Sequence, residues 1–156
     1  MTSKIQTDIS QFLPYLLNQA AEITSAEFQQ HYRQKYGMLR TEWRVLFHLG
    51  QFGKMTAKQI CEMSAIHKTK VSRAVQALEQ KRLLKRETDS NDRRLEHLSP
   101  TKNGAAVFTE LKSAAETYDE KLSSQFDEEE MEQLRASLVK LVAQLRPSKK
   151  GTDRFS

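Results

Sequence analysis

Residues 67–102 constrain the fold most, because they have the pattern of one basic helix followed at once by a short charged hairpin. In the first half of this stretch, apolar residues recur at intervals of three, four and seven, which places them along one side of an α-helix over residues 67–84. That side should face a core. The residues that form it are Val71, Ala74, Val75 and Leu78.

The opposite side of the predicted helix carries groups that suit DNA. Because an α-helix turns by about 100° per residue, hydroxyl, amide and guanidinium groups lie together on this side, with lysines beside them. Such groups bond base edges and phosphates in a major groove. A merely solvated helix face is the competing interpretation. The residues concerned are Lys68, Thr69, Lys70, Ser72, Arg73 and Gln76.

The segment after this helix favours the DNA-binding interpretation. Residues 84–88 and 95–98 are long enough for two strands, and residues 89–94 between them are turn formers that end in Arg93 and Arg94. A hairpin beside a DNA-reading helix is the wing of a winged helix-turn-helix, and an arginine at its tip can enter a narrow minor groove. A solubilising turn is the alternative.

The distribution of charge points the same way. Residues 67–102 contain ten Lys or Arg and five Asp or Glu, and the whole chain has a formal net charge of +5. The excess positive charge is therefore confined to the stretch where phosphate contacts would be needed.

Composition predicts a mainly α-helical chain of about one domain. It has 156 residues, of which 38% are hydrophobic, with five Gly and three Pro. The single cysteine, Cys61, excludes an internal disulfide framework and is expected to be a small buried side chain. No apolar leader or membrane-length run is visible, so a cytoplasmic protein is expected.

Helical spacing continues through most of the remaining chain. Thr56 and Gln59 fit a capping box that opens a short helix, which with the next helix would form a helix-turn-helix. Ser99 and Pro100 are expected to cap and open the helix after the hairpin. The predicted helices span residues 9–34, 41–52, 56–63, 67–84, 100–124 and 128–146.

The first and the last two helices carry more apolar surface than a small DNA-reading head can cover. A second copy of the chain is expected to cover it, although packing within one chain is the alternative. The expected organisation is a helical dimerisation region (1–36 and 100–146), a winged helix-turn-helix (37–99) and a polar tail (147–156).

Three motifs resemble the MarR/SlyA family of bacterial winged-helix transcriptional regulators over about residues 9–146. They are LRTEWRVL at 39–46, VSRAV at 71–75 with Leu78-Glu79, and DSNDRR at 89–94 leading into LSPTKNG at 98–104. The resemblance implies an obligate homodimer with interleaved terminal helices, whose two winged heads occupy successive grooves of a palindromic operator.

The resemblance also implies residue roles. Ser72, Arg73 and Gln76 would lie in the major groove, Lys68, Thr69 and Lys70 near phosphates, and Arg94 in the minor groove. Asp92 would hold the wing arginines in shape. Two departures from the family pattern stand out. Arg82 replaces a usual glycine, which makes a different exit from the helix toward the wing an alternative, and His67 replaces a better capping residue.

Members of this family often bind small aromatic acids or other lipophilic anions in a cleft. Here the aromatic walls and the carboxylate partner would come from Tyr36, Arg40, Trp43 and Arg44. Trp43 in a core and Arg44 in a salt bridge are the structural alternatives.

No catalytic constellation is visible, so an enzyme, a cofactor or a metal site is not expected. The leading interpretation is a homodimeric sequence-specific regulator, most often a repressor in this family. A sequence-tolerant architectural DNA-binding protein and a winged helix converted to protein interaction are the alternatives.

Overall fold

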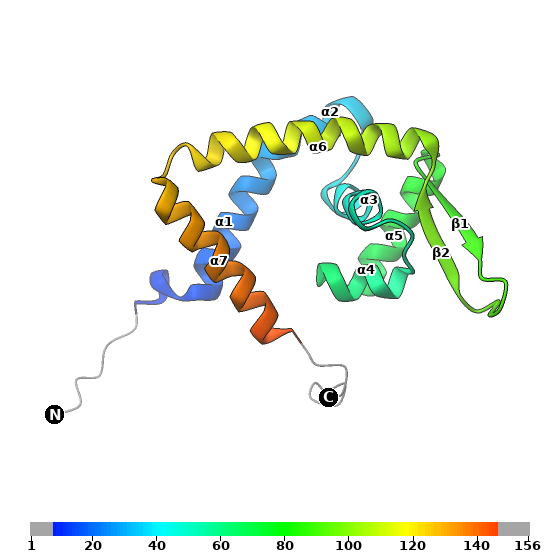
Figure 1. Ribbon diagram of the computed structural model, residues 1–156, viewed down its shortest axis with the longest axis horizontal. Helices are drawn as coiled ribbons and strands as arrows, with labels where there is room; N and C mark the ends of the chain where they lie inside the picture. Colours follow the sequence, from blue (N-terminus) through cyan, green and yellow to red (C-terminus); the bar gives the residue numbers. More distant parts are fainter. Residues whose placement is uncertain (1–7, 147–156) are drawn as a thin grey trace. The chain divides into compact units, whose positions relative to one another are not determined.

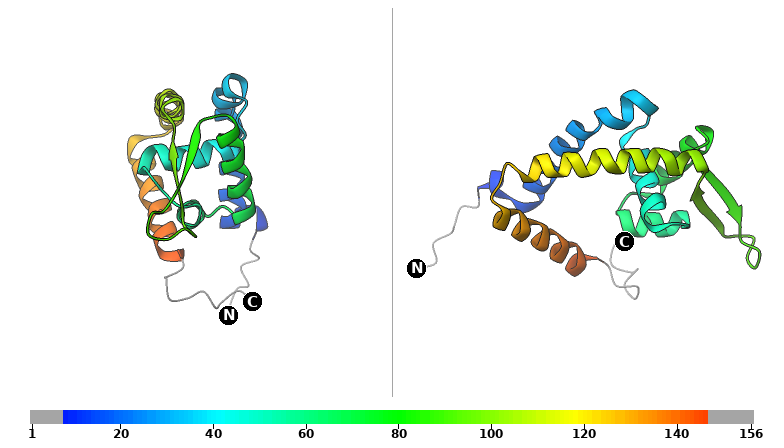
Figure 2. Two further views of the ribbon diagram at one scale, coloured as in Figure 1. Left: turned by 90° about the vertical axis from the view of Figure 1, so that its right-hand side faces the viewer. Right: turned by 45° about the horizontal axis from the view of Figure 1, so that its top comes forward.

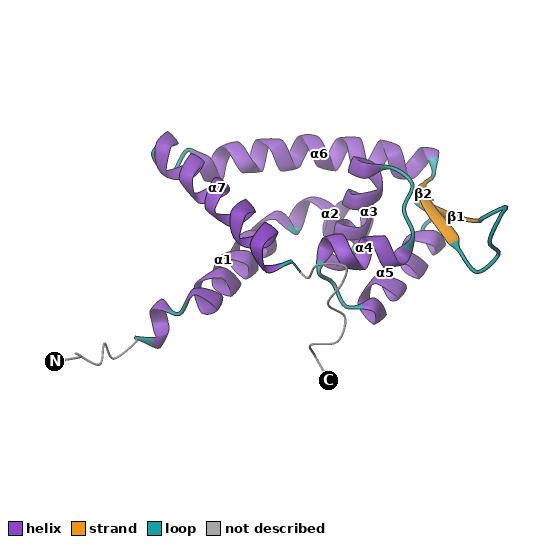
Figure 3. Cartoon of the chain, turned by 60° about the horizontal axis from the view of Figure 1, so that its bottom comes forward, coloured by secondary structure: helices purple, strands orange, loops and turns teal. Residues whose placement is uncertain are grey.

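The computed structural model describes residues 8–146 as a mainly helical chain with one two-stranded antiparallel sheet (Figures 1 and 3). This confirms the predicted fold class. Within these residues no helix has both the length and the apolar character needed to cross a membrane. The predicted tail, 147–156, lies outside the described residues. The elements in order are η1 (Ile9–Gln11), α1 (Leu13–Phe28), α2 (Gln30–Tyr36), α3 (Arg40–Phe52), α4 (Ala57–Ser64), α5 (Lys68–Gln80), β1 (Leu84–Thr88), β2 (Glu96–Pro100), α6 (Lys102–Ser123) and α7 (Glu128–Leu145).

The chain divides into two compact units, one up to Ala115 and one from Glu116 onward. The core of the first unit lies between α3, α4, α5, the hairpin and the start of α6. All four residues predicted for the core side of the basic helix are buried there. They share this core with apolar residues of the neighbouring elements, which are Val45, Leu46, Leu49, Ile60, Leu84, Leu98, Phe108 and Leu111.

The predicted long N-terminal helix is wrong in its continuity, because the structure divides it into η1, α1 and α2. Phe12 is extended, and Pro14, which lacks an N–H donor, stands in the first turn of α1 as expected. A second interruption falls at Gln29. No glycine or proline marks that position, so the sequence gives no local reason for the break. Gly37, with a positive φ of 62°, ends α2 as predicted.

Helix α5 ends at Gln80, four residues before the predicted end. Arg82 adopts the left-handed conformation, with φ of 59°. The N–H of Arg82 bonds to Glu79 O at 2.9 Å and that of Leu83 to Leu78 O at 2.9 Å, which is the Schellman pattern of helix termination. Leu78 and Leu83 are both buried. The left-handed exit that glycine usually provides is therefore kept here by an arginine.

The hairpin extends further along the chain than predicted. Ser99 and Pro100 pair with Lys85 and Leu84 in the sheet, so their predicted role as helix cap and first-turn proline is wrong. Thr101 takes that role instead, because its Oγ1 accepts the N–H of Gly104 at 3.0 Å and donates to Arg82 O at 2.6 Å.

The second unit contains the end of α6 and the whole of α7. Arg135 of α7 binds Asp119 of α6 at 2.8 Å. Asp127 stands at the N-cap position, as predicted, but its side chain makes no capping hydrogen bond. Three glutamates follow in the first turn of α7, where carboxylates suit the positive end of the helix dipole.

Candidate nucleic-acid interface

A tight turn between α4 and α5 sets the direction of the candidate DNA-reading helix, α5. The predicted capping box opens α4, with Thr56 and Gln59 exchanging bonds of 2.9 and 3.2 Å. Ala65 closes α4 in a left-handed conformation, with φ of 57°. His67 caps α5, because its Nδ1 accepts the N–H of Thr69 at 3.2 Å. The two helices thus form the predicted helix-turn-helix.

The polar side of α5 is open to solvent along its whole length. All six residues predicted to contact DNA on this helix are exposed, while the four on the opposite side are buried. Among the described residues, the side chains of Lys68, Lys70 and Arg73 form no ion pair. Their charges are therefore available to an outside anion. The exposed residues are Lys68, Thr69, Lys70, Ser72, Arg73 and Gln76.

The wing tip presents Arg94 at the far end of the hairpin. Figure 2 shows the loop between β1 and β2 extending away from α3, α4 and α5. The Arg94 side chain is 92% exposed, and Asp92 Oδ1 accepts both its backbone N–H at 3.0 Å and its Nε–H at 3.1 Å. These bonds lower the pKa of the Asp92 carboxyl, with the side-chain bond as the largest cause. Arg93 beside it is also exposed.

A second carboxylate organises the same loop and was not predicted as a site residue. Asp89 Oδ1 accepts the N–H groups of Asn91 at 2.8 Å and Asp92 at 3.0 Å. Asp89 Oδ2 lies 2.8 Å from His97 Nε2. The bond from His97, followed by the two backbone bonds, lowers the pKa of the Asp89 carboxyl. The sequence offered a clue, since aspartate at the start of a turn often bonds the backbone two residues later.

Ion pairs join the wing to the helices behind it. Arg86 of β1 donates to Glu79 of α5 at 3.1 Å and to Glu96 of β2 at 3.2 Å. Lys54, in the loop before α4, binds Glu87 at 2.8 Å. Because Arg86 contacts both α5 and the hairpin, it fixes the spacing between the two candidate DNA-contacting elements.

A buried carboxylate connects α3 to the end of α5. Glu42 is only 3% exposed; its Oε2 accepts the N–H of Leu39 at 2.7 Å and its Oε1 accepts from Lys81 at 2.5 Å. A buried charge is tolerated when it is paired and hydrogen-bonded in this way. The pair ties the C-terminal end of α5 to α3.

The four residues predicted for an effector cleft lie on α2 and α3, each engaged by another part of the first unit. Tyr36 donates to Glu110 at 2.5 Å, and Arg40 binds Glu22 at 2.7 Å. Arg44 donates to Ser64 O at 3.1 Å, and burial, followed by the charge of Arg40, lowers its pKa.

Trp43, the fourth of these residues, packs in an aromatic cluster. Its ring centroid lies 5.7 Å from that of Phe28, 6.1 Å from that of Tyr32 and 5.8 Å from that of Phe47.

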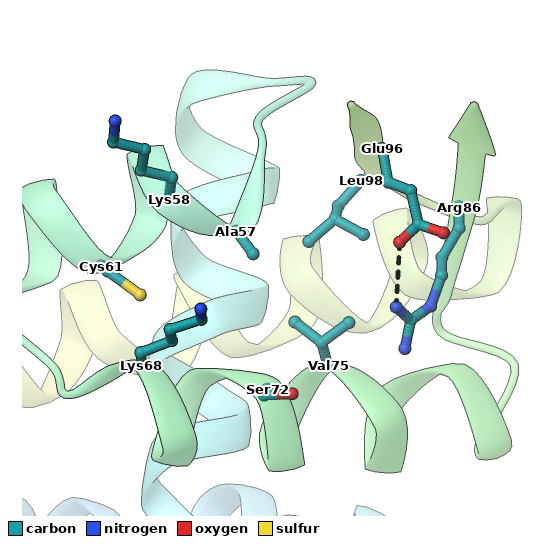
Figure 4. A pocket seen from close by; sticks show the side chains of 9 residues that line it. All are labelled: Ala57, Lys58, Cys61, Lys68, Ser72, Val75, Arg86, Glu96 and Leu98. Carbon is teal, nitrogen blue, oxygen red and sulfur yellow. Dashed lines mark hydrogen bonds and ion pairs between the residues drawn. The ribbon is translucent and has the colours of Figure 1, made fainter. Parts of the chain in front are cut away.

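A cavity of about 420 Å³ lies elsewhere, between α4, α5 and the hairpin (Figure 4). Its lining includes Cys61, which is half-buried rather than buried as predicted, and two lysines, Lys58 and Lys68. The sequence did not predict this cavity, because residues from three separate elements form it. Its walls are Ala57, Lys58, Cys61, Lys68, Ser72, Val75, Arg86, Glu96 and Leu98.

Comparison with known proteins gives the same picture of the winged region. Residues 36–95 match the model of a family described as "MarR family". The chain is 26% identical over 95 residues to the Uncharacterized HTH-type transcriptional regulator YwaE of Bacillus subtilis (strain 168), a match that spans 61% of this chain and 56% of YwaE. The chain thus spans just over half the length of that relative.

Solved structures share the fold over most of the chain. A MarR/EmrR family transcriptional regulator from Acinetobacter sp. ADP1 superposes with a TM-score of 0.79 at 26% identity, over 88% of this chain and 96% of that one. The S. aureus MepR–DNA complex superposes with a TM-score of 0.73 at 26% identity, over 84% of this chain and 96% of that one. NadR in complex with 4-hydroxyphenylacetate superposes with a TM-score of 0.71 at 22% identity, over 90% of this chain and 96% of that one.

Proposed function

Because the chain belongs to the MarR family of winged helix-turn-helix transcriptional regulators, we propose that it acts as a homodimer that reads a palindromic operator and represses transcription. Each protomer places α5 in a major groove and the wing tip in the adjacent minor groove. Two-fold symmetric readers of this kind contact half-sites one helical turn apart.

One observation carries this proposal. The whole polar side of α5 is exposed while its opposite side is buried, and the wing beside it ends in an exposed arginine that a neighbouring carboxylate orients. On α5, Arg73 and Gln76 have the donors and acceptors that base edges require, and Lys68 and Lys70 have the charge that phosphates require.

Exposed apolar surface supports the homodimer. Helix α7 has no buried residue along its 18 residues, and Leu134, Leu138, Val142 and Leu145 on it are exposed. Helix α1 buries only Phe28. Apolar surface of this extent marks a protein interface. A second copy would cover these helices and supply the second half-site reader.

Substitution of Arg94 and Arg73 by alanine tests the proposed contacts. Arg94→Ala should weaken binding to the operator by about tenfold or more without changing stability, because its guanidinium is exposed. If Arg73 contacts a base edge, Arg73→Ala should reduce the binding free energy by about 1–3 kcal/mol and relax the base preference. If Arg73 contacts phosphate, the variant should bind all sequences more weakly by the same factor. Arg33→Ala is the matched control, since it removes an exposed arginine from α2. Unchanged affinity in both test variants would refute the interface.

A sequence-tolerant architectural role is the second candidate, supported by the unpaired cations of α5. In that case affinity would fall steeply with salt and hardly depend on sequence. Conversion to a protein-interaction module is less well supported, because such a protein has no need for the exposed Ser72, Arg73 and Arg94 on the DNA side.

We also propose that a small aromatic or lipophilic acid relieves repression by binding near Tyr36, Arg40, Trp43 and Arg44. Trp43 and its aromatic neighbours would furnish the walls. A ligand carboxylate would replace Glu22 as the partner of Arg40. Because this exchange breaks a contact between α1 and α3, it would move the two winged helix-turn-helix regions of the dimer away from their DNA-binding spacing. NadR, a protein with this fold, has been crystallised with 4-hydroxyphenylacetate.

Titration with a panel of aromatic acids tests this effector proposal. Binding should raise the melting temperature and weaken DNA affinity, and Arg40→Ala should abolish both effects while Arg33→Ala keeps them. If no acid changes either quantity in the unsubstituted protein, the effector proposal fails and the DNA-binding proposal remains.

A further inference from the structure

The hairpin is anchored in the core only at its base. Leu84 of β1 and Leu98 of β2 are each 2% exposed, and Leu98 exchanges backbone hydrogen bonds with Met55 at 2.7 and 3.0 Å. Every residue from 85 to 97 is exposed or half-buried. Burial therefore fixes where the wing begins, but it does not fix the direction in which the wing tip points.

Two ion pairs on opposite faces of β1 hold the exposed part of the hairpin. Successive residues of a strand face opposite sides of the sheet. Arg86 donates from Nε to Glu79 of α5 at 3.1 Å, and Figure 4 shows its side chain running from β1 toward that helix. Glu87, on the other face, binds Lys54 in the loop before α4 at 2.8 Å. The Arg86–Glu79 ion pair therefore joins the wing to the helix that is proposed to enter the major groove.

The Arg86–Glu79 ion pair is better suited to set a direction than to stabilise the fold. The two side chains are 35% and 43% exposed, and exposed ion pairs contribute little to stability. The guanidinium is nevertheless held at a second nitrogen, because Glu96 accepts from it at 3.2 Å. A planar guanidinium that carboxylates bind at two nitrogens has a defined orientation.

We propose that Arg86 and Glu79 are positioning residues for DNA recognition, which fix the distance between the half-site that α5 reads and the minor groove that Arg94 enters. This rests on the proposed function, in which both elements contact DNA. The width of a minor groove depends on its sequence, so an arginine held at a fixed distance selects the sequence at that distance. A wing that swings freely reaches several positions and loses this selection.

The test compares Glu79→Gln with Glu96→Gln, each alone and combined with Arg94→Ala. Each glutamine variant removes one carboxylate from Arg86 and one negative charge from the protein. Only Glu79→Gln breaks the link between α5 and the wing, because Glu96 belongs to the same hairpin, whose strands also pair through their backbones. Both variants should keep the melting temperature of the unsubstituted protein within about 4 °C.

Operator affinity should be about three- to tenfold lower for Glu79→Gln than for Glu96→Gln. When both also carry Arg94→Ala, the difference should shrink to less than about twofold, because the group that the ion pair positions is absent. An ion pair that served only the fold would weaken binding equally with and without Arg94. Equal affinity of the two glutamine variants, or a difference that persists without Arg94, would overturn the inference.

Base preference provides a second measurement. Duplexes that Glu79→Gln selects from a random pool should keep the preference of the unsubstituted protein at the positions that α5 contacts. They should lose most of the preference in the flanking minor groove, whereas Glu96→Gln should keep both. Identical flanking preferences in the two variants would contradict the proposed control of distance.

Residual dipolar couplings without DNA separate this inference from the proposed function. The amide couplings of residues 86–94 should fit the alignment of α5 in the unsubstituted protein and in Glu96→Gln, and should be reduced in Glu79→Gln. If they fit equally well in Glu79→Gln, the inference fails even if DNA binds. If the unsubstituted protein binds no DNA, the proposed function fails, whatever the couplings show.

Discussion

Arg82 occupies a left-handed backbone conformation that a side chain with a Cβ atom usually avoids. Its φ of 59° closes the Schellman turn after α5 and directs the chain into β1. The left-handed conformation costs a residue other than glycine about 1–2 kcal/mol. A sequence comparison can flag the missing glycine, but it cannot decide whether the turn changes or the arginine accepts the cost.

Arg82→Gly should therefore stabilise the fold, and Arg82→Ala should not. Glycine relieves the Cβ contact but adds backbone entropy to the unfolded chain. The free energy of unfolding of the glycine variant should therefore exceed that of the alanine variant by about 0.5–1 kcal/mol. Both variants lose the same charge, which makes alanine the control. Urea denaturation at one protein concentration measures the difference. Equal stability of the two variants would contradict this account of the turn.

At the scale of elements, the wing depends on ionised carboxylates. Hydrogen bonds lower the pKa of Asp89 and of Asp92 below the ordinary value of 3.8. The order that these groups provide is complete above about pH 4 and is lost as pH falls through the lowered values. Amide NMR spectra recorded between about pH 6 and pH 2 should show the signals of Asn91 and Asp92 leaving their folded chemical shifts at the acidic end. The amide signals of the buried residues of α5 should change only at lower pH.

Asp89→Asn is the control for this acid transition. It keeps an oxygen acceptor for the two backbone N–H groups but does not titrate. Any loss of loop order that the variant still shows as pH falls should therefore come from protonation of Asp92. A loop that keeps its folded signals while both carboxyls protonate would contradict the assignment.

The junction between the wing and α6 depends on a glycine. A Cβ atom at Gly104 would lie 1.9 Å from Leu83 O, a backbone atom that already accepts the N–H of Thr101 at 3.1 Å. Gly104→Ala should therefore destabilise the fold by about 1–3 kcal/mol. Ala105→Ser, on the exposed side of the same turn, should change stability by less than about 0.5 kcal/mol. Thermal unfolding compares the two, and equal melting temperatures would refute the close approach.

Sequence periodicity predicted the elements that carry a strong one-sided pattern. The buried side of α5, the capping box of α4 and the first strand were all placed correctly, since each follows from local spacing or local hydrogen bonding. The break at Gln29, the extension of β2 through Pro100 and the Asp89–His97 pair were missed. The extension of β2 depends on its pairing with β1, and the Asp89–His97 contact depends on the folded hairpin; local propensity does not contain that information. The break at Gln29 has no explanation in the local sequence.

At the scale of the whole molecule, the exposed apolar side of α7 is the surface on which the proposed homodimer would form. Leu138→Glu should place a charge in that surface and yield a monomer at concentrations where the unsubstituted protein is a dimer. Operator affinity should fall with it, because one head contacts one half-site. Gln133→Glu adds the same charge at an exposed polar position of α7 and should leave the dimer intact. Sedimentation equilibrium decides, and a dimeric Leu138→Glu would remove α7 from the interface.

The central claim is that this chain reads a specific DNA sequence as a dimer. Selection of bound duplexes from a random pool at near-physiological salt, followed by affinity for the selected sequence against a scrambled one, tests it most directly. The expected result is a palindromic consensus bound at least about a thousandfold more tightly than scrambled DNA. Failure to obtain a consensus, together with binding that disappears as salt rises, would contradict the claim and indicate an architectural role.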